Sequence, residues 1–178
     1  MNDPVVIVDY KSRWPILYDE EMKAICGVLG NRIFAIEHIG STAVPNLGGK
    51  NIIDIMLGVR SFDEANECLP LLEGIDYKEV IPQVNNADWY YCLGKRQQNI
   101  GYHLHLVKFD SEHWKKHLIF RDFLRKNPQV SRDYCNLKKE LATKYGTDRL
   151  GYTEAKTTFI ESILASAKRH ATSQIKKH

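Results

Sequence analysis

The sequence predicts a mixed α/β fold of the α+β kind, with a β-sheet and flanking helices followed by a helical C-terminal part. Short runs with β-branched and aromatic residues, such as 33–39, 52–59 and 102–109, are typical of strands. Apolar residues at helical spacing occur between some of these runs, and from residue 111 onward the pattern is helical. The 178 residues are enough for one domain with a real core. We expect an α/β core at 1–110, a helical part packed on it at 111–170 and a frayed tail at 171–178.

The first elements are an extended start at 5–8 and a helix over about Pro15–Leu29. Proline suits a first helical turn, and Gly30 is a natural end for this helix. Residues 33–39 are expected to form a strand that leads into a Gly-Ser turn. A capping box at 61–64 predicts a further helix to about Leu72.

The strand expected at 52–59 places one carboxylate in an apolar run. Because side chains alternate along a strand, Asp54 shares a face with Ile52 and Met56, and the odd-numbered residues 53–59 share the other. A lone buried charge is costly unless it has a partner or binds a cation.

Three further strands are expected near 77–81, 88–93 and 102–109, with a hairpin loop at 94–101 between the last two. Three helices should follow. They are expected over about Glu112–Lys126, from Asn127-Pro128 to Gly146, and from about Thr153.

The charge distribution is uneven along the chain. Residues 1–110 contain ten Lys and Arg against fifteen Asp and Glu, whereas residues 111–178 contain fifteen against seven. This asymmetry indicates an anionic ligand held between the two parts, or simply solvated helix faces.

The composition excludes some classes of protein. No run of about 20 apolar residues occurs, and the N-terminus lacks the pattern of a secretory signal, so we expect a cytoplasmic protein with no membrane partner. The four cysteines form no CxxC pair and are expected to be reduced. Nucleic-acid binding through the basic C-terminal part stays open, although no RRM, KH or helix-turn-helix motif supports it.

The loop between the strands at 33–39 and 52–59 is a candidate phosphate site. It is not a P-loop, since Val44 and Asn51 stand where that motif needs Gly and Ser or Thr. The backbone of a Gly-Ser turn and a serine hydroxyl can nevertheless hold phosphate oxygens, and an aspartate on the next strand can hold Mg²⁺. The alternative is a tight turn with Asp54 capping a neighbouring backbone. Candidate phosphate ligands in this loop are Gly40, Ser41, Thr42 and Lys50.

Two histidines, His103 and His105, share one strand face. They could reach one metal ion, bind phosphate or carry protons, and would converge on Asp54 if the two strands are neighbours. The alternative for each is a hydrogen-bonded structural histidine.

A basic stripe is expected on the helix around 112–126, where His117, Arg121 and Arg125 are spaced by four. Guanidinium groups suit bidentate phosphate contacts. The competing interpretation is an ion pair within the fold, for instance with Asp122 or Asp133.

At these residues the chain resembles the GrpB (glutamate-rich protein) family, over roughly residues 5–168. The resembling segments are "VDYKSRWPILYDEE", "IEHIGSTAVPNLGGKNIIDI", "YHLHLV", "HWKKHLIFRDFLRKNP" and "GYTEAKTTFI". The family in turn resembles the DNA polymerase beta-type nucleotidyltransferase superfamily. That resemblance implies a nucleotidyltransferase-like mixed sheet, a Gly-Ser turn at Gly40-Ser41 that binds NTP phosphates, and a metal-binding aspartate at Asp54.

The chain departs from the superfamily pattern in its carboxylates. The superfamily usually has two, one residue apart on one strand face, but Ile52 and Met56 occupy the positions in phase with Asp54. His103 or His105 would replace the usual third carboxylate, and Glu37 could supply a second from the preceding strand. One Asp with histidines favours a single metal, Mn²⁺ or Zn²⁺ over Mg²⁺.

The resulting expectation is a protein that binds an NTP and a divalent metal, Mg²⁺ or Mn²⁺, and transfers a nucleoside monophosphate to an unknown acceptor. Asp54, His103 and His105 would be metal-binding and catalytic, and Arg121 and Arg125 would neutralise phosphate charge. Two alternatives remain. One is a non-catalytic domain that binds a phosphate-bearing ligand or a partner on the same fold, and the other is a metal-dependent hydrolase that uses His103, His105 and Asp54.

Overall fold

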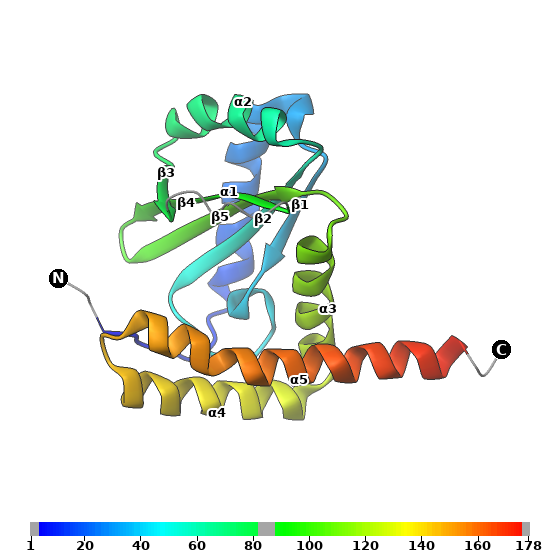
Figure 1. Ribbon diagram of the computed structural model, residues 1–178. Helices are drawn as coiled ribbons and strands as arrows, with labels where there is room; N and C mark the ends of the chain where they lie inside the picture. The colour runs from blue at the N-terminus through cyan, green and yellow to red at the C-terminus, as the bar shows by residue number, and fades with distance from the viewer. Residues whose placement is uncertain (1–3, 82–87, 176–178) are drawn as a thin grey trace.

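The structure, a computed structural model, describes residues 4–81 and 88–175 and confirms the α+β fold class (Figure 1). One mixed β-sheet lies between two layers of helices. In chain order the elements are α1 (Arg13–Leu29), η1 (Gly30–Arg32), β1 (Ala35–Ile39), η2 (Ser41–Ala43), β2 (Ile52–Val59), α2 (Phe62–Glu73), β3 (Lys78–Ile81), β4 (Trp89–Gln97), β5 (Ile100–Lys108), α3 (Glu112–Lys126), α4 (Pro128–Tyr145) and α5 (Arg149–Ile175).

The strands follow the order β1-β2-β5-β4-β3, so two strands far apart in the sequence meet in the middle of the sheet. The central pair, β2 and β5, is parallel, and the other three pairs are antiparallel. Within the central pair Asp54 is opposite His103 and Met56 is opposite His105. The order of the strands therefore produces the convergence on which the sequence-based site depended.

Helices α1 and α2 cover one face of the sheet, where the main hydrophobic core lies. The apolar face of β2 that alternation predicts, Ile53 to Val59, packs there against Trp14 and Ile25 of α1 and Leu72 of α2. Each of these side chains is inaccessible to solvent. Burial of this apolar surface is the main force holding the two helices on the sheet.

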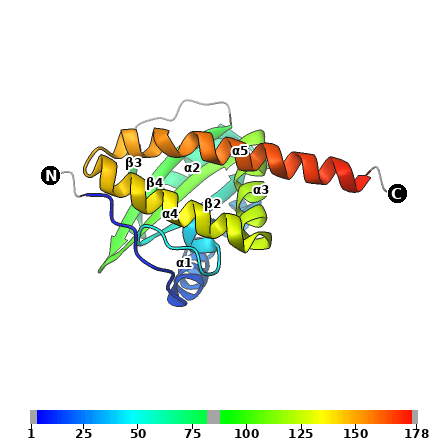
Figure 2. The same ribbon diagram turned by 90° about the horizontal axis from the view of Figure 1, so that it is seen from below.

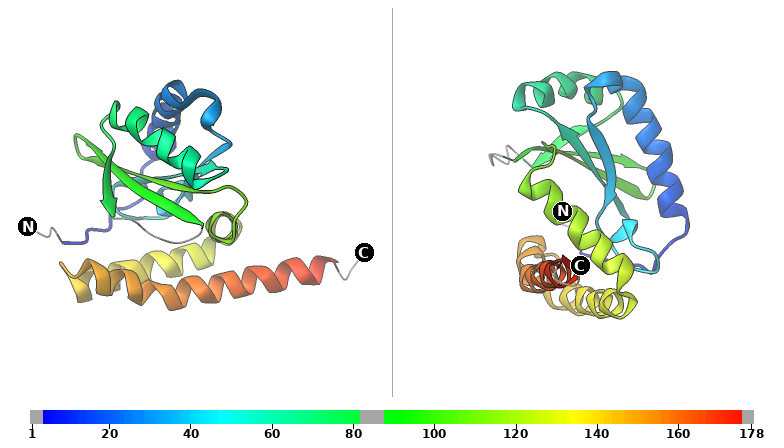
Figure 3. Two further views of the ribbon diagram at one scale, coloured as in Figure 1. Left: turned by 45° about the horizontal axis from the view of Figure 1, so that its top comes forward. Right: turned by 90° about the vertical axis from the view of Figure 1, so that its right-hand side faces the viewer.

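The other face of the sheet carries Asp54 and is covered by the C-terminal helices (Figure 3). Trp114 of α3 packs against Ile39 of β1 and Met56 of β2. Helices α4 and α5 lie side by side as an additional layer beyond α3, and α5 continues past the other elements at its C-terminal end (Figures 1 and 2). A cluster around Leu47 and Tyr134 joins these helices to the loop after β1.

Some expected boundaries were wrong. The loop expected at 94–101 is mostly paired strand, because β4 reaches Gln97 and β5 begins at Ile100. The reversal needs only Gln98 and Asn99, with Gln98 in the left-handed region at φ 54°. Polar residues can occupy such a strand because side chains at a hairpin tip remain solvated.

The last helix begins at Arg149 rather than near Thr153, and its backbone is helical to Ile175. The fraying expected over 171–178 stays a prediction. No Pro or Gly follows Gly151 to interrupt it. Within the described ranges, no helix combines the length and apolar character needed to cross a membrane.

Candidate functional site

Asp54 lies between the two histidines of β5. Its Oδ1 is 3.4 Å from His103 Nδ1 and 3.9 Å from His105 Nε2. Burial alone would raise the pKa of Asp54, but hydrogen bonds from the two imidazoles and their positive charge hold it well below its ordinary value. Asp54 is therefore a stable carboxylate at neutral pH, and its histidines can donate to it.

The Gly-Ser turn is held directly against this carboxylate. Gly40 has φ 70°, and a Cβ built at this position would lie 2.5 Å from Asp54 Oδ2. The next residues form η2, in which the buried Thr42 hydroxyl lies 3.0 Å from His38 Nε2. Burial lowers the pKa of His38 to about 4, so this imidazole is neutral at pH 7. The turn is thus fixed by the approach of Gly40 to Asp54 and by the Thr42–His38 contact.

Replacing Gly40 with alanine tests this close approach. We expect a loss of about 3 kcal/mol in the free energy of unfolding, since alanine is strained at positive φ and its methyl group must displace the Asp54 carboxylate. Gly30→Ala is the matched control, because Gly30 also has positive φ (58°) but nothing lies within 4 Å of its added Cβ. We expect that control to cost about 1–2 kcal/mol, from backbone strain alone. Urea denaturation would measure the free energy of unfolding of both variants. Equal losses would show that the Asp54 carboxylate moves away from the added methyl group at no cost.

Lys138 of α4 reaches the same turn from the helical part. Its Nζ donates to Ser41 Oγ at 2.7 Å and to the carbonyl oxygen of Gly48, and the residue is only 2 % exposed. Burial lowers the pKa of Lys138 to about 7. The protonated and neutral forms of this amine are therefore similarly populated near neutral pH, and an anion placed beside it would favour the protonated form.

These residues line a cavity of about 470 Å³ between the sheet and the C-terminal helices. Gly40, Ser41, Thr42, Asp54 and His105 form one side of it. Its cationic side chains are Lys50, Lys116, Lys138 and Lys156. Among the described residues that line it, Asp54 is the only acidic one. We call it the lysine cavity, and its balance of charge suits an anion.

Arg121 and Arg125, expected to neutralise phosphate charge, both donate hydrogen bonds to oxygens of the protein. Arg121 donates to Glu37 Oε2 at 2.6 Å, to the His38 carbonyl oxygen at 3.0 Å and to Asp122 Oδ1 at 2.8 Å. Arg125 donates through Nε and Nη2 to the carbonyl oxygen of Ala43, at 3.0 and 2.8 Å. Neither arginine lines the lysine cavity. In this arrangement Arg121 connects α3 to β1, and Arg125 connects α3 to η2.

A divalent metal at Asp54, His103 and His105 stays a prediction that the placement of the donors does not support. Both imidazoles point a ring nitrogen at one carboxylate oxygen, at 3.4 Å for His103 and 3.9 Å for His105. Glu37 shares the face of the sheet with Asp54, but its carboxylate pairs with Arg121. Across residues 4–81 and 88–175, no group of three or more His, Cys, Asp or Glu side chains is placed to hold a metal ion. As they lie, these residues do not fit Mg²⁺ or Mn²⁺, which need several oxygen ligands.

Three lysines of the cavity were missed by sequence reasoning: Lys116, Lys138 and Lys156. One of them could have been found. Lys138 lies four residues after Tyr134 and three before Leu141, so it falls within the apolar stripe of its helix. A lysine in that position is either buried with partners or bends out to solvent.

A family model described as GrpB protein matches residues 4–166. The chain belongs to the GrpB family. The glutamate-rich protein GrpB of Alkalihalophilus pseudofirmus is 33% identical over 165 residues, which cover 90% of this chain and 94% of that protein. The crystal structure of the conserved protein GrpB from Enterococcus faecalis has a TM-score of 0.81 at 30% identity, covering 93% of this chain and 99% of that one.

A more distant likeness concerns the fold alone. The structure of Cid1 in complex with the UTP analog UMPNPP has a TM-score of 0.52 at 11% identity, and covers 77% of this GrpB chain and 41% of Cid1.

Proposed function

We propose that this GrpB-family protein binds a nucleotide or another small phosphate-bearing molecule in the lysine cavity. The observation that carries this proposal is the grouping of four lysines around the Gly-Ser turn with one carboxylate. A phosphate group gains from several nearby cations, and the backbone of a turn can add N–H donors.

The cavity supplies charge without needing a metal ion. Lys116 and Lys50 have no ion-pair partner among the described residues. Burial lowers the pKa of Lys156 to about 8, as it lowers that of Lys138, and a bound anion would restore both charges. A ligand with two or more negative charges would therefore be favoured over a neutral one.

The distant likeness to Cid1, whose structure holds a UTP analog, makes a nucleoside triphosphate a reasonable first probe. Apolar side chains also line the cavity, among them Phe120, Ile160 and Leu164, and could contact a base or sugar.

Transfer of a nucleoside monophosphate is a second candidate function. The Asp54–His103 pair favours it, because His103 Nδ1 faces the carboxylate at 3.4 Å, which leaves Nε2 of this partly exposed imidazole to take up a proton from an attacking hydroxyl. The metal-dependent hydrolase has no comparable support, because Asp54, His103 and His105 are not placed to hold a metal ion.

Asp54→Asn separates simple binding from metal-assisted transfer. Under the binding proposal we expect UTP affinity, measured by titration calorimetry with a chelator present, to be unchanged or higher, because a negative charge beside the phosphates is lost. Lys116→Gln should weaken UTP binding about tenfold, a change of about 1.4 kcal/mol. The matched control is Lys126→Gln, which removes the same charge from the exposed end of the same helix.

Two results would contradict the binding proposal. If UTP binds only with Mg²⁺ or Mn²⁺ and Asp54→Asn abolishes this binding, Asp54 is a metal ligand and transfer becomes the better hypothesis. If neither UTP, ATP nor inorganic phosphate binds the wild-type protein at millimolar concentration, the lysine cavity is not a phosphate site.

A further inference from the structure

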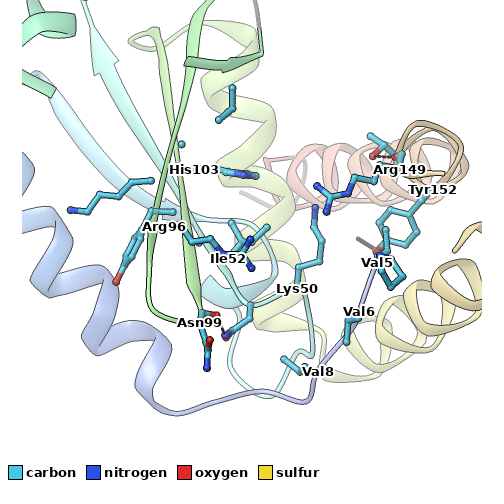
Figure 4. A pocket seen from close by; sticks show the side chains of 18 of the residues that line it. Val5, Val6, Val8, Lys50, Ile52, Arg96, Asn99, His103, Arg149 and Tyr152 are labelled. Carbon is cyan, nitrogen blue, oxygen red and sulfur yellow. Dashed lines mark hydrogen bonds between the residues drawn. The ribbon is translucent and has the colours of Figure 1, made fainter. Parts of the chain in front are cut away.

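A larger cavity, of about 800 Å³, lies beside the lysine cavity. The two share Lys50, Ile52, Tyr152 and Thr153. The larger cavity is bounded by the ends of the central strands, by the N-terminal segment with Val5, Val6 and Val8, and by the start of α5 (Figure 4). We call it the valine cavity.

The two histidines of β5 are divided between the cavities. His103 lines the valine cavity and His105 lines the lysine cavity, although both imidazoles approach the same oxygen of Asp54. The Asp54 carboxylate is therefore linked to both cavities, and molecules bound in the two would meet at this group.

The valine cavity also has cationic walls. Lys50, Lys78 and Arg96 line it, and none has an ion-pair partner among the residues that the structure describes. Lys95 lines it too, but its charge is balanced by Glu21 at 3.0 Å. Asp76 is the one acidic residue in the described lining. The charge of this cavity thus favours an anion.

Its remaining surface is largely apolar. Val5, Val6, Val8 and Val80 contribute to it, and Val6 is 60 % exposed. An inorganic anion would leave this surface in contact with water, whereas an organic anion could cover it.

We propose that the valine cavity binds a second ligand, an organic anion with an apolar part, beside the phosphate-bearing ligand of the lysine cavity. The pairing of two ligands rests on the proposed function, but the second site itself does not. Lys50 and the Asp54–His103 pair lie where the two ligands would approach each other. An enzyme that joins or exchanges groups between two substrates needs this arrangement.

The test uses 8-anilinonaphthalene-1-sulfonate, a sulfonate on an aromatic frame whose fluorescence rises in apolar surroundings. We expect this probe to bind the wild-type protein, and its affinity to fall at least tenfold in the double variant Lys78→Gln with Arg96→Gln. The matched control is Lys23→Gln with Lys126→Gln, which removes two exposed charges that line neither cavity. Val6→Glu, a change at an exposed position that places a negative charge in the valine cavity, should weaken the probe as well. Circular dichroism would confirm that each variant is folded.

Titration with UTP separates this inference from the proposed function. Saturating UTP should leave the probe bound, and the change at Lys78 and Arg96 should leave UTP affinity within about twofold. Equal probe affinity in the two double variants, or complete displacement of the probe by UTP, would overturn the second site. A third outcome would separate the two proposals. If probe affinity falls in the Lys78 and Arg96 variant but not in its control, and the wild-type protein binds no UTP or phosphate, the second site is supported and the proposed function is rejected.

Discussion

Replacing Lys138 with methionine is expected to remove much of the rise in stability between pH 7 and about pH 8.5. The pKa of Lys138 falls from 10.5 to about 7 on folding because the amine is buried. Between these values the folded protein holds a neutral amine and the unfolded chain a protonated one, so unfolding takes up a proton. The free energy of unfolding therefore rises with pH, by at most about 1.4 kcal/mol per pH unit for one such group.

The pH range is chosen so that the two buried lysines make the largest contribution to the slope. Above it the cysteines act in the opposite direction, since burial raises the pKa of Cys68 and Cys92 and their thiols ionise more readily in the unfolded chain. Within it Lys156, with its pKa lowered to about 8, contributes with the same sign as Lys138. We expect Lys138→Met to show a smaller slope than the wild-type protein, and Lys138→Met with Lys156→Met a smaller one still. Part of the slope near pH 7 should remain in both, because burial also lowers the pKa of His38 and His113 to about 4.

Urea denaturation at a series of pH values would measure the slope. Lys139→Gln is the control, because Lys139 is the next residue along the helix but is exposed and pairs with Asp9 at the surface. It should keep the slope of the wild-type protein. An unchanged slope in Lys138→Met would show that this amine is charged in the folded protein at neutral pH.

The faces of the strands could be predicted from the sequence because alternation is a local property of a strand. Ile53 and Leu104 lie in the main core, and Asp54 and His103 lie on the opposite face, as the pattern indicated. The order of the strands could not be predicted in this way. The pairing of β2 with β5 is a long-range property that depends on how the elements pack together. The sequence could therefore predict that Asp54 meets the histidines only if these two strands are neighbours, and the strand order shows that they are.

The cationic side of the site was harder to predict. Lys138 is buried because Ser41 Oγ and the Gly48 carbonyl oxygen accept hydrogen bonds from it, and these acceptors are 97 and 90 positions earlier in the chain. Local patterns place a lysine in solvent unless such partners are known. Arg121 shows the converse. The spacing of Arg121 within a basic stripe of its helix suggested a phosphate ligand. That spacing says nothing of the Glu37 carboxylate on β1, with which Arg121 forms an ion pair.

Replacing Arg121 with methionine is expected to destabilise the protein by about 2–3 kcal/mol, because it leaves Glu37 and the His38 carbonyl without their donor. The value is at the low end for a buried pair, since Glu37 and Asp122 are partly exposed and water screens them. Glu37→Gln in the same chain should recover part of the loss, and Arg132→Met, at an exposed position of α4, should cost less than about 0.5 kcal/mol.

Thermal and urea unfolding of the single and double variants would measure the coupling between Arg121 and Glu37. The same variants also decide between the two interpretations of Arg121. If it is a positioning residue that ties α3 to β1, stability falls and the folded variant retains UTP affinity within about threefold. A variant with unchanged stability and more than tenfold weaker UTP binding would instead make Arg121 a phosphate ligand. That outcome would require the guanidinium to leave Glu37 and turn toward the lysine cavity when ligand binds, since in the present arrangement three protein oxygens hold it.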